Sequence, residues 1–185
     1  WSVFNGYDGA SSTTAMTLKG SSCGGFIEGE IERVEPRFSF SNSESISGTA
    51  EINVLAIKCT RQINGFASQE EIFVSDISIS ADTGKNVIIH IYLNPTALGN
   101  GTTVDFPTWI AVGEFSGTET DVQSVSHTGG TLLFATTLSK TGTVELDMRV
   151  RNVLLEIGDI LLITAQPVST TTGDVIAVIN WVEEL

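Results

Sequence analysis

The sequence predicts an all-β protein, an antiparallel β-sandwich of the jelly-roll type with an extended N-terminal arm. Several segments alternate apolar and polar residues with a period of two, which is the pattern of a half-buried strand. Gly, Asn, Asp and Ser recur between these segments at spacings of about 10 residues. No segment shows the periodicity of an amphipathic helix. Because 185 residues suit one large domain, we assign residues 1–25 to an arm or loop-rich edge and 26–185 to a single sandwich domain.

The clearest pair of strands lies between Glu71 and Pro95, and we interpret it as a β-hairpin around which the other strands pack. The apolar residues of the first strand that share a face are Phe73, Ile77, Ile79 and Ala81. Those of the second strand are Val87, Ile89, Ile91 and Leu93. The intervening segment 82–86 has the Asp, Gly and Asn of a tight turn. Pro95 ends the second strand, since proline cannot donate to a β-ladder.

The N-terminal segment is rich in Gly, Ser and Thr and carries scattered aromatic residues. Trp1, Phe4 and Tyr7 would be exposed on an isolated subunit, so we predict that they contact a neighbouring subunit. The alternative is a surface segment ordered by local contacts. The chain begins with Trp1 rather than Met and has no signal peptide at its start, so we expect its natural start to be missing or processed.

The remaining strands are predicted from their own patterns of apolar and charged residues. Phe26–Phe40 is a charged segment with Pro36, as in an edge strand, and the polar segment Ser41–Gly48 is predicted as a loop. Glu51–Cys59 is apolar on both faces, which is typical of a central strand. The further predicted strands are Trp109–Val112, Val122–Ser126, Thr131–Leu138, Thr143–Arg151, Asp159–Pro167 and Asp174–Glu183. Thr96–Thr108 and Ser116–Asp121 are predicted as loops, and in Thr143–Arg151 we expect Val144, Leu146, Met148 and Val150 to face inward.

The net charge of −13, from 22 acidic and 9 basic residues, argues against a nucleic-acid partner and against an anionic membrane surface. The acidity favours solubility. The mean hydropathy is nevertheless positive, at +0.19, which suggests that some apolar surface is buried between subunits. No run of 18 apolar residues is present to span a membrane.

The sequence predicts no metal and no other cofactor. Its two cysteines, Cys23 and Cys59, form no zinc-binding pattern, and a disulfide between them is left open, with Cys59 more typical of a small core residue. Glu114, Glu119 and Asp121 could collect Ca²⁺ around a polar loop. Because the EF-hand spacing is missing, a solvated loop is the preferred interpretation.

Three short motifs resemble parts of catalytic sites, and none is complete. Asp82-Thr83-Gly84 is the triplet of aspartic proteases, but its neighbours fit a turn better. Lys140-Thr141-Gly142 lacks the Ser-x-x-Lys that β-lactamases also need. His90 and His127 have no Gly-x-Ser-x-Gly nucleophile motif to serve. We therefore predict that the protein is not an enzyme.

Three aromatic residues, Tyr92, Trp109 and Trp181, could stack on sugars, although core packing is the commoner role of aromatic residues in strands. A ligand-binding loop is the sharper hypothesis for Trp109, Glu114, Glu119 and Asp121. On that hypothesis a free-standing carbohydrate-binding module is one alternative function.

Residues 71–185 carry a series of motifs that resembles the C-terminal β-domain of tailed-bacteriophage virion surface proteins. The motifs are Asn94-Pro95-Thr96 after a strand, Gly129-Gly130 before a strand, Gly158-Asp159 in a turn and Asn180-Trp181-Val182-Glu183-Glu184 in the closing strand. The resemblance implies a structural protein on the particle surface, without catalytic residues.

From the resemblance we expect a capsid decoration (cement) protein in the virion. It would be a homotrimer that binds the major capsid protein or other virion proteins. The alternative within the same family is a head or tail fibre, or a receptor-binding β-domain that contacts a host glycan or protein through its loops.

Overall fold

The computed structural model describes residues 37–60, 62–63, 66–67, 71–99, 109–113 and 116–184. These residues belong to a compact unit that extends from Glu35 to Leu185. Trp1, Phe4, Tyr7 and the predicted arm 1–25 lie outside the described residues, as do Cys23 and Glu114.

Two antiparallel sheets form the unit, and we call them sheet I and sheet II. Sheet I has the strand order β1 (Arg37–Gly48), β15 (Thr171–Glu184), β5 (Glu71–Thr83) and β12 (Thr143–Asp147), and β13 (Leu154–Leu155) also pairs with β5. Sheet II has the order β11 (Thr131–Leu138), β6 (Val87–Leu93), β14 (Ile160–Pro167), β2 (Ile52–Cys59), β9 (Thr118–Asp121) and β8 (Ile110–Ala111). Two small pairs complete the strands: β7 (Ala97–Gly99) with β10 (Ser126–Thr128), and β3 (Gln62–Ile63) with β4 (Phe66–Ala67). The helical content of the described residues is one 3-10 turn, η1 (Arg149–Arg151), so none of their helices could cross a membrane.

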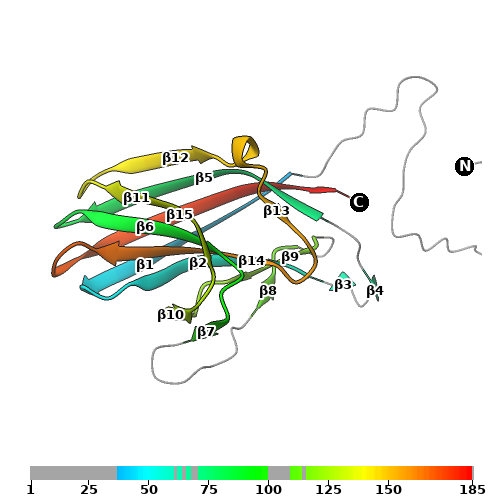
Figure 1. Cartoon of the computed structure of the whole chain (residues 1–185), viewed down its shortest axis with the longest axis horizontal. Helices are drawn as coiled ribbons and strands as arrows, with labels where there is room; N and C mark the ends of the chain where they lie inside the picture. Colours follow the sequence, from blue (N-terminus) through cyan, green and yellow to red (C-terminus); the bar gives the residue numbers. More distant parts are fainter. Residues whose placement is uncertain are drawn as a thin grey trace, which may run out of the picture. The chain divides into compact units, whose positions relative to one another are not determined.

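Four strand pairs are nested in the order of the chain, which is the topology of a jelly roll. β1 pairs with β15, β2 with β14, β5 with β12 and β6 with β11, and successive pairs belong alternately to sheet I and sheet II. The four short connections within this wrap gather at one end of the sandwich, and the long connections lie at the other (Figure 1). The predicted antiparallel, jelly-roll-like sandwich is confirmed.

Aliphatic side chains fill the space between the sheets. Sheet I contributes alternate residues of β5 and β15, and sheet II contributes alternate residues of β6, β14 and β2. The members of this core that are fully buried include Ile77, Ile79, Val175, Ile179, Val87, Ile89, Ile91, Leu161, Ile163, Leu55, Ile57 and Cys59. Each buried side chain of this size contributes about 1.5–3 kcal/mol, so this layer dominates the stability of the fold.

The predicted hairpin between Glu71 and Pro95 is wrong as a pairing, although both of its strands exist. β5 belongs to sheet I and β6 to sheet II, so the turn 84–86 carries the chain from one sheet to the other. The apolar faces of the two strands therefore meet across the core rather than lying side by side. Alternation of apolar residues is the same in both arrangements, because it reports burial of one face and not the identity of the paired strand.

A β-bulge in β5 also corrects the predicted inner face of that strand. Asp76 pairs with Asn180 and Val74 with Trp181, which leaves Ser75 as an extra residue. The alternation therefore shifts by one residue at Ser75. Val74 is buried, as is Ile72, whereas Phe73 is 36% exposed on the outer face.

The segment Ser41–Gly48, predicted as a loop, is part of the long edge strand β1. The segment resembles a polar loop in sequence because every outward position from 39 to 47 is serine. Phe40 and Ile46 point toward the core. β1 pairs with β15 over all of its 12 residues without a register shift. The predicted edge position is correct for residues 37–40, which begin this strand.

Two predicted strand boundaries are also wrong. Ser116–Asp121, predicted as a polar loop, contains β9, whose Thr118 and Thr120 are buried, and Val122–Ser126 is largely irregular. β12 ends at Asp147 because the chain turns into η1, so Met148 is buried as predicted but Val150 is 83% exposed.

Candidate interaction surfaces

The outer face of sheet I is a regular array of small, apolar and acidic side chains. The edge strand β1 contributes five exposed serines, which are Ser39, Ser41, Ser43, Ser45 and Ser47. The neighbouring β15 contributes Thr172, Asp174, Ile176, Val178, Asn180 and Val182, because these residues pair with outward-facing positions of β1 and β5. Among the described residues, no second layer of strands pairs onto this face.

An apolar stripe follows β15 along the middle of this face. Ile176 is 44% exposed, and Val178 and Val182 are half-buried in the same row. Phe73 of β5 lies opposite Val182 and extends the stripe sideways. Asn180 interrupts this row between Val178 and Val182. Neighbouring apolar residues on one face are more typical of an interaction surface than isolated ones.

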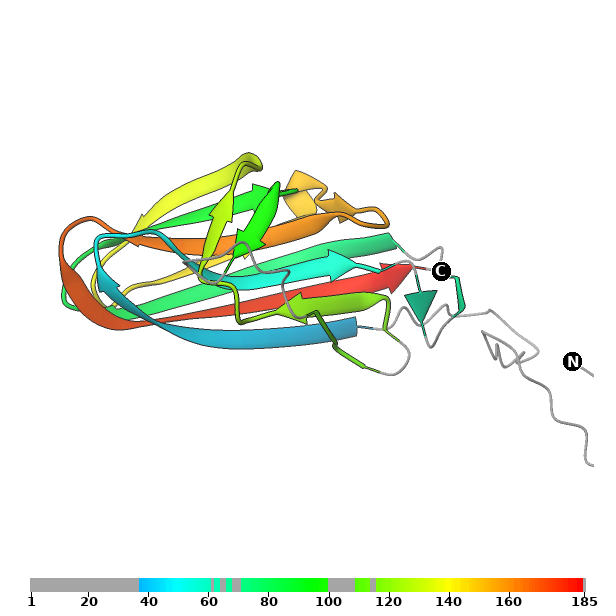
Figure 2. The same cartoon turned by 90° about the horizontal axis from the view of Figure 1, so that it is seen from below.

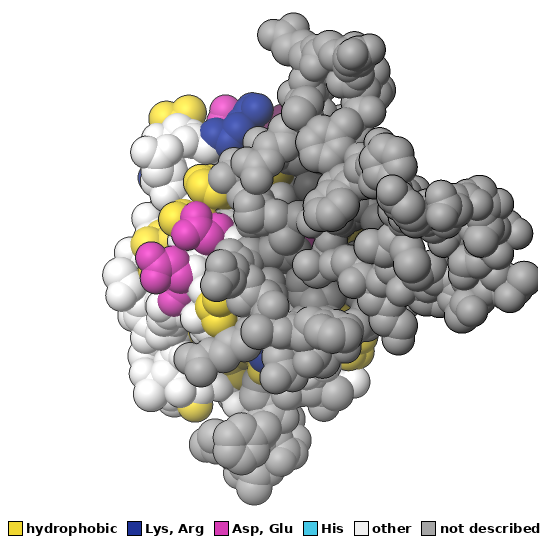
Figure 3. All heavy atoms as spheres, turned by 90° about the vertical axis from the view of Figure 1, so that its right-hand side faces the viewer, with side chains coloured by type: hydrophobic (Ala, Val, Ile, Leu, Met, Phe, Trp, Pro, Cys, Tyr) yellow, Lys and Arg dark blue, Asp and Glu magenta, His cyan; other side chains and the backbone are white. Residues whose placement is uncertain are grey.

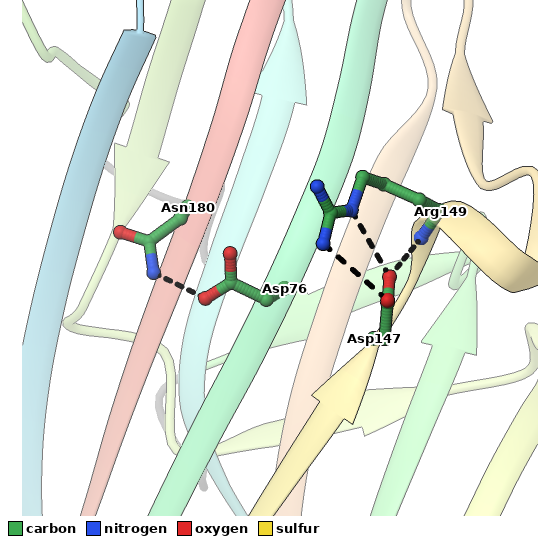
Figure 4. A network of polar contacts seen from close by, with 4 residues as sticks. All are labelled: Asp76, Asp147, Arg149 and Asn180. Atoms are coloured by element: carbon green, nitrogen blue, oxygen red, sulfur yellow. Dashed lines mark hydrogen bonds and ion pairs between the residues drawn. The ribbon is translucent and has the colours of Figure 1, made fainter.

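Carboxylates lie beside this stripe (Figure 4). Asp76 Oδ1 accepts a hydrogen bond of 2.5 Å from Asn180 Nδ2, and Asp147 accepts two from the guanidinium of Arg149, at 3.2 and 3.4 Å. The hydrogen bond from the Arg149 side chain is the main cause that lowers the pKa of Asp147. Asp174 Oδ1 accepts a bond of 2.6 Å from Ser45 Oγ at the β1 edge of the face. Acidic and apolar side chains also lie next to each other at the end of the sandwich with the long connections (Figure 3).

The outer face of sheet II is covered in part by the connection between β6 and β11, which contains β7 to β10. Leu98 of β7 packs on Ala56 and Leu162 to make a second small core, with half-buried Tyr92, Trp109 and Ile160 at its margin. Val125 N donates to Gly99 O, and Asn53 N donates to Val125 O, so backbone bonds fasten this connection to β2. The two outer faces of the sandwich are therefore different: the described connection covers much of one and leaves the other open.

Both histidines of the chain lie in a polar cluster beneath this connection. Glu51 Oε1 accepts hydrogen bonds from Thr164 Oγ1 and, at 2.9 Å, from His90 Nδ1. The ring of Tyr92 lies 5.8 Å from that of His90 and 4.6 Å from that of His127. Burial raises the pKa of the Tyr92 hydroxyl, and the charge of Glu51 and a hydrogen bond to it add to the shift.

His127 attaches β10 to sheet II. Its Nδ1 lies 3.1 Å from Asn53 Oδ1, which can only accept, so Nδ1 carries a proton and donates. Asn53 Nδ2 in turn donates to Ser124 Oγ and Ser126 O, at 3.1 and 2.7 Å. Burial lowers the pKa of His127, because a protonated imidazole would lose its hydration here. The hydrogen-bond partners of the two histidines in the described residues are Glu51 and Asn53, so the cluster positions a surface connection.

The predicted ligand-loop residues have contacts within the protein. Lys58 Nζ lies 4.4 Å from the ring centroid of Trp109 and 2.5 Å from Glu119 Oε2, so these three side chains form one group. Asp121 is buried at the end of β9, and its Oδ1 accepts hydrogen bonds from the backbone N–H groups of Gln123 and Ser124. No metal-binding group of three His, Cys, Asp or Glu residues occurs in the part of the chain that the structure describes. A ligand role for Trp109, Glu119 and Asp121 stays a prediction.

The two catalytic-looking triplets lie at turns, as their composition predicted. Asp82-Thr83-Gly84 ends β5, and the Thr83 hydroxyl donates to Lys85 O at 2.5 Å. Lys140-Thr141-Gly142 forms the connection between β11 and β12, where Gly142 N donates to Ser139 O.

A buried carboxylate that the sequence analysis missed connects the two sheets. Glu183 at the end of β15 is 1% exposed, and its two oxygens accept four hydrogen bonds. Ser116 Oγ, Thr118 Oγ1 and Trp181 Nε1 donate to Oε1 at 2.6, 2.7 and 3.0 Å, and Gly117 N donates to Oε2 at 2.9 Å. Residues 116–118 lead into β9 of sheet II, so Glu183 links sheet I to sheet II at this end of the core.

This contact explains most of the closing Asn-Trp-Val-Glu motif in structural terms. Trp181 is 1% exposed and stacks on Phe38, with ring centroids 5.9 Å apart, so it offers no platform for a sugar. Asn180 bonds to Asp76, and Glu183 is the buried acceptor. The presence of two acidic residues after a Trp was the available signal, but spacing alone does not distinguish a buried carboxylate from a solvated one.

Comparison with known proteins yields only distant structural likenesses. No protein-family model matches the sequence, and no curated protein matches it. A crystal structure of the infectious bursal disease virus VP2 subviral particle is 14% identical over 83% of this chain and 42% of that chain, with a TM-score of 0.21. A structure of the Gt strain of the same virus is 12% identical over 98% of this chain and 50% of that chain, with a TM-score of 0.19. The chain thus spans half or less of the chains it matches, and such TM-scores carry no argument about fold or function.

Replacement of Glu183 by Ala should destabilise the protein strongly, because it leaves four buried donors without their acceptor. We expect the free energy of unfolding to fall by at least about 2 kcal/mol. Glu183→Gln, which keeps the shape and one acceptor oxygen, should lose less. The measurement is urea unfolding followed by Trp fluorescence. The matched control is Glu145→Ala on the exposed face of sheet I, which should change stability by less than about 0.5 kcal/mol. Equal effects at both positions would contradict the proposed link between the sheets.

Protonation of His127 should weaken the fold, because its pKa is lower in the folded protein than in the unfolded chain. The folded state then binds fewer protons, so stability is fully present above the unfolded pKa of about 6.5 and is lost as pH falls through the folded value. We expect the wild-type protein to lose more unfolding free energy between about pH 7.5 and about pH 5 than the His127→Gln variant does. Urea unfolding at the two pH values measures both. Identical losses in the two proteins would show that burial of His127 does not couple to folding.

Proposed function

We propose that this protein is a structural component of a virion, exposed on the particle surface, and that it acts by binding other protein subunits rather than by catalysis. The observation that carries the proposal is the eight-strand jelly roll with its nested strand pairs. Jelly rolls recur in viral capsid domains, and also in lectins and cupins. The resemblance of the closing motifs to tailed-phage virion surface proteins favours the first of these groups, and within it a capsid decoration protein.

The interior supports a building block over a pocketed enzyme or lectin. The inner faces of the strands carry fully buried Ile, Leu and Val rather than groups that could act on a ligand. The buried carboxylate of Glu183 has its acceptor positions used by Ser116, Gly117, Thr118 and Trp181. Interaction through the outer surface is the function that this arrangement serves best.

The outer face of sheet I is the surface that we propose for contact with the particle. It combines an apolar stripe at Ile176, Val178 and Phe73 with carboxylates at Asp76 and Asp147. The apolar residues would provide buried area at about 25 cal/mol per Å². The carboxylates would select a partner surface that carries Lys or Arg.

A fibre or receptor-binding domain is the second candidate, and the connection between β6 and β11 favours it. Trp109 and Glu119 of this connection form a group with Lys58 of β2 on the outer side of sheet II. A surface loop on a rigid sandwich is a usual place for ligand recognition. On this alternative the protein would be present in far fewer copies than the shell protein.

Quantitative mass spectrometry of gradient-purified particles tests the proposal and separates the two candidates. We expect the chain to copurify with intact particles in a fixed ratio to the major shell protein, and at a comparable copy number. A fixed but far lower ratio would favour the fibre alternative. Absence of the chain from particles that contain all their other proteins would overturn the virion proposal.

A further inference from the structure

β1 presents the longest free strand edge among the described residues. It stands at the end of sheet I and pairs on one side with β15 over 12 residues. The described residues contain no backbone partner for its other side, where alternate N–H and C=O groups are left for a further strand. In Figure 2 this strand, drawn in blue, lies along the lower margin of the sandwich.

The other edges of the two sheets are short or interrupted. β12 has five residues, and its outward positions include Glu145 and Asp147. β11 has a register shift between Leu132 and Phe134, and β8 has two residues. Proteins usually protect edge strands with bulges, proline, lysine or short length. β1 contains no proline, no lysine and no register shift. Its one inward-facing charge is Glu44, which is half-buried and already accepts a hydrogen bond from Asn42.

We propose that the β1 edge is an interface between two copies of this chain, which join antiparallel about a two-fold axis through Ser43. The contact would extend sheet I of one copy into sheet I of the other, with the two serine faces on the same side. A second copy of the chain would be one of the protein subunits that the proposed function requires it to bind. The dimer itself is inferred from the properties of β1 alone.

The side chains of β1 are complementary to themselves in this register. Because directly opposite residues share a face, Asn42 lies opposite Glu44 of the second copy, and Phe40 lies opposite Ile46. Within one chain Asn42 Nδ2 donates to Glu44 Oε1 at 3.0 Å and to Val54 O at 2.7 Å, so in the dimer the bond to Glu44 of the second copy would replace the bond to Glu44 of the same chain. The outward positions pair serine with serine, as Ser41 with Ser45 and Ser43 with itself.

Two-fold axes through the residues next to Ser43 give less favourable side-chain pairs, so the axis through Ser43 is preferred. An axis through Glu44 would place two carboxylates directly opposite each other, which is destabilising. An axis through Asn42 would set Phe40 opposite Glu44. In the Ser43 register, Arg37 falls beyond the paired segment and no like charges meet. A three-fold contact in a larger assembly would use another surface, because a two-fold pairing of this kind is closed.

Site-specific cross-linking of the full chain tests the register. In a background with Cys23→Ser, Ser43→Cys should cross-link to its own copy with a short bismaleimide, because the two positions are directly opposite. Ser39→Cys alone is the matched control and should not cross-link, since two copies of residue 39 would be about 26 Å apart. An equal mixture of the Ser39→Cys and Ser47→Cys proteins should cross-link, because these positions pair with each other.

Sedimentation velocity tests the interface independently. Wild-type protein should sediment as a dimer or an even-numbered oligomer, and Ser43→Lys should weaken its association at least tenfold, because two ammonium groups would lie opposite each other. Ser78→Lys, on the outer face in the middle of sheet I, is the control and should leave the association unchanged.

A wild-type monomer at every concentration would overturn the proposal, as would dimers that are insensitive to Ser43→Lys and do not cross-link at residue 43. These measurements use the purified chain, so their outcome is independent of whether the chain is found on particles. Failure of the dimer proposal and failure of the virion proposal can therefore be told apart.

Discussion

The aliphatic contact between the inner faces of the two sheets is the interaction on which the rest of the structure depends. Ile77 and Ile79 of sheet I are fully buried in one hydrophobic cluster with Ile89 and Ile91 of sheet II. Because β5 and β6 are joined only by residues 84–86, this contact fixes where the turn between them must lie. The nested pairing of the other strands then places later segments beside earlier ones, and β15 closes the wrap against both β1 and β5.

Polar contacts refine this arrangement where the aliphatic core ends. Glu183 occupies an inner position of β15, and four donors satisfy it, so a buried carboxylate is tolerated there. On the outer side of sheet II, Asn53 hydrogen-bonds His127 of β10, and Glu51 hydrogen-bonds His90. Both groups act on one connection, which therefore has a fixed place on sheet II.

This asymmetry is what the proposed function depends on. One outer face of the sandwich is occupied by the protein's own connection, and the other keeps exposed Ile176 and Phe73 among acidic side chains. Next to that open face, one side of β1 has no strand partner among the described residues. A protein that binds neighbours through a flat face and a strand edge is suited to an assembled surface, and its negative charge would keep free subunits soluble before assembly.

The sequence predicted the strands better than their partners. Apolar patterning located β2, β5, β6, β11 and β14, since burial of one or both faces of a strand is a local property. The assignment of β5 and β6 to different sheets depends on contacts between distant residues, such as β5 with β15, which no local pattern contains. The bulge at Ser75 and the serine-faced half of β1 were missed for related reasons. A bulge reverses the alternation, and a strand with one fully polar face resembles a loop.

The candidate surfaces were less predictable than the fold. Glu183 and Asp147 are both acidic residues in strands, and only the structure distinguishes the buried one from the exposed one. Trp181 was a possible sugar platform from composition, and its burial against Phe38 removes that role. The aromatic residues predicted to contact neighbouring subunits, Trp1, Phe4 and Tyr7, lie outside the described residues and stay a prediction.

Electron microscopy of intact particles labelled with gold-tagged antibody against this chain tests the central claim most directly. The account predicts label spread over the surface of the head, as expected for a decoration protein. Label confined to the tail or its fibres would contradict the decoration role and support receptor binding. Particles without any label, under conditions where the antibody binds the purified chain, would contradict the virion role itself.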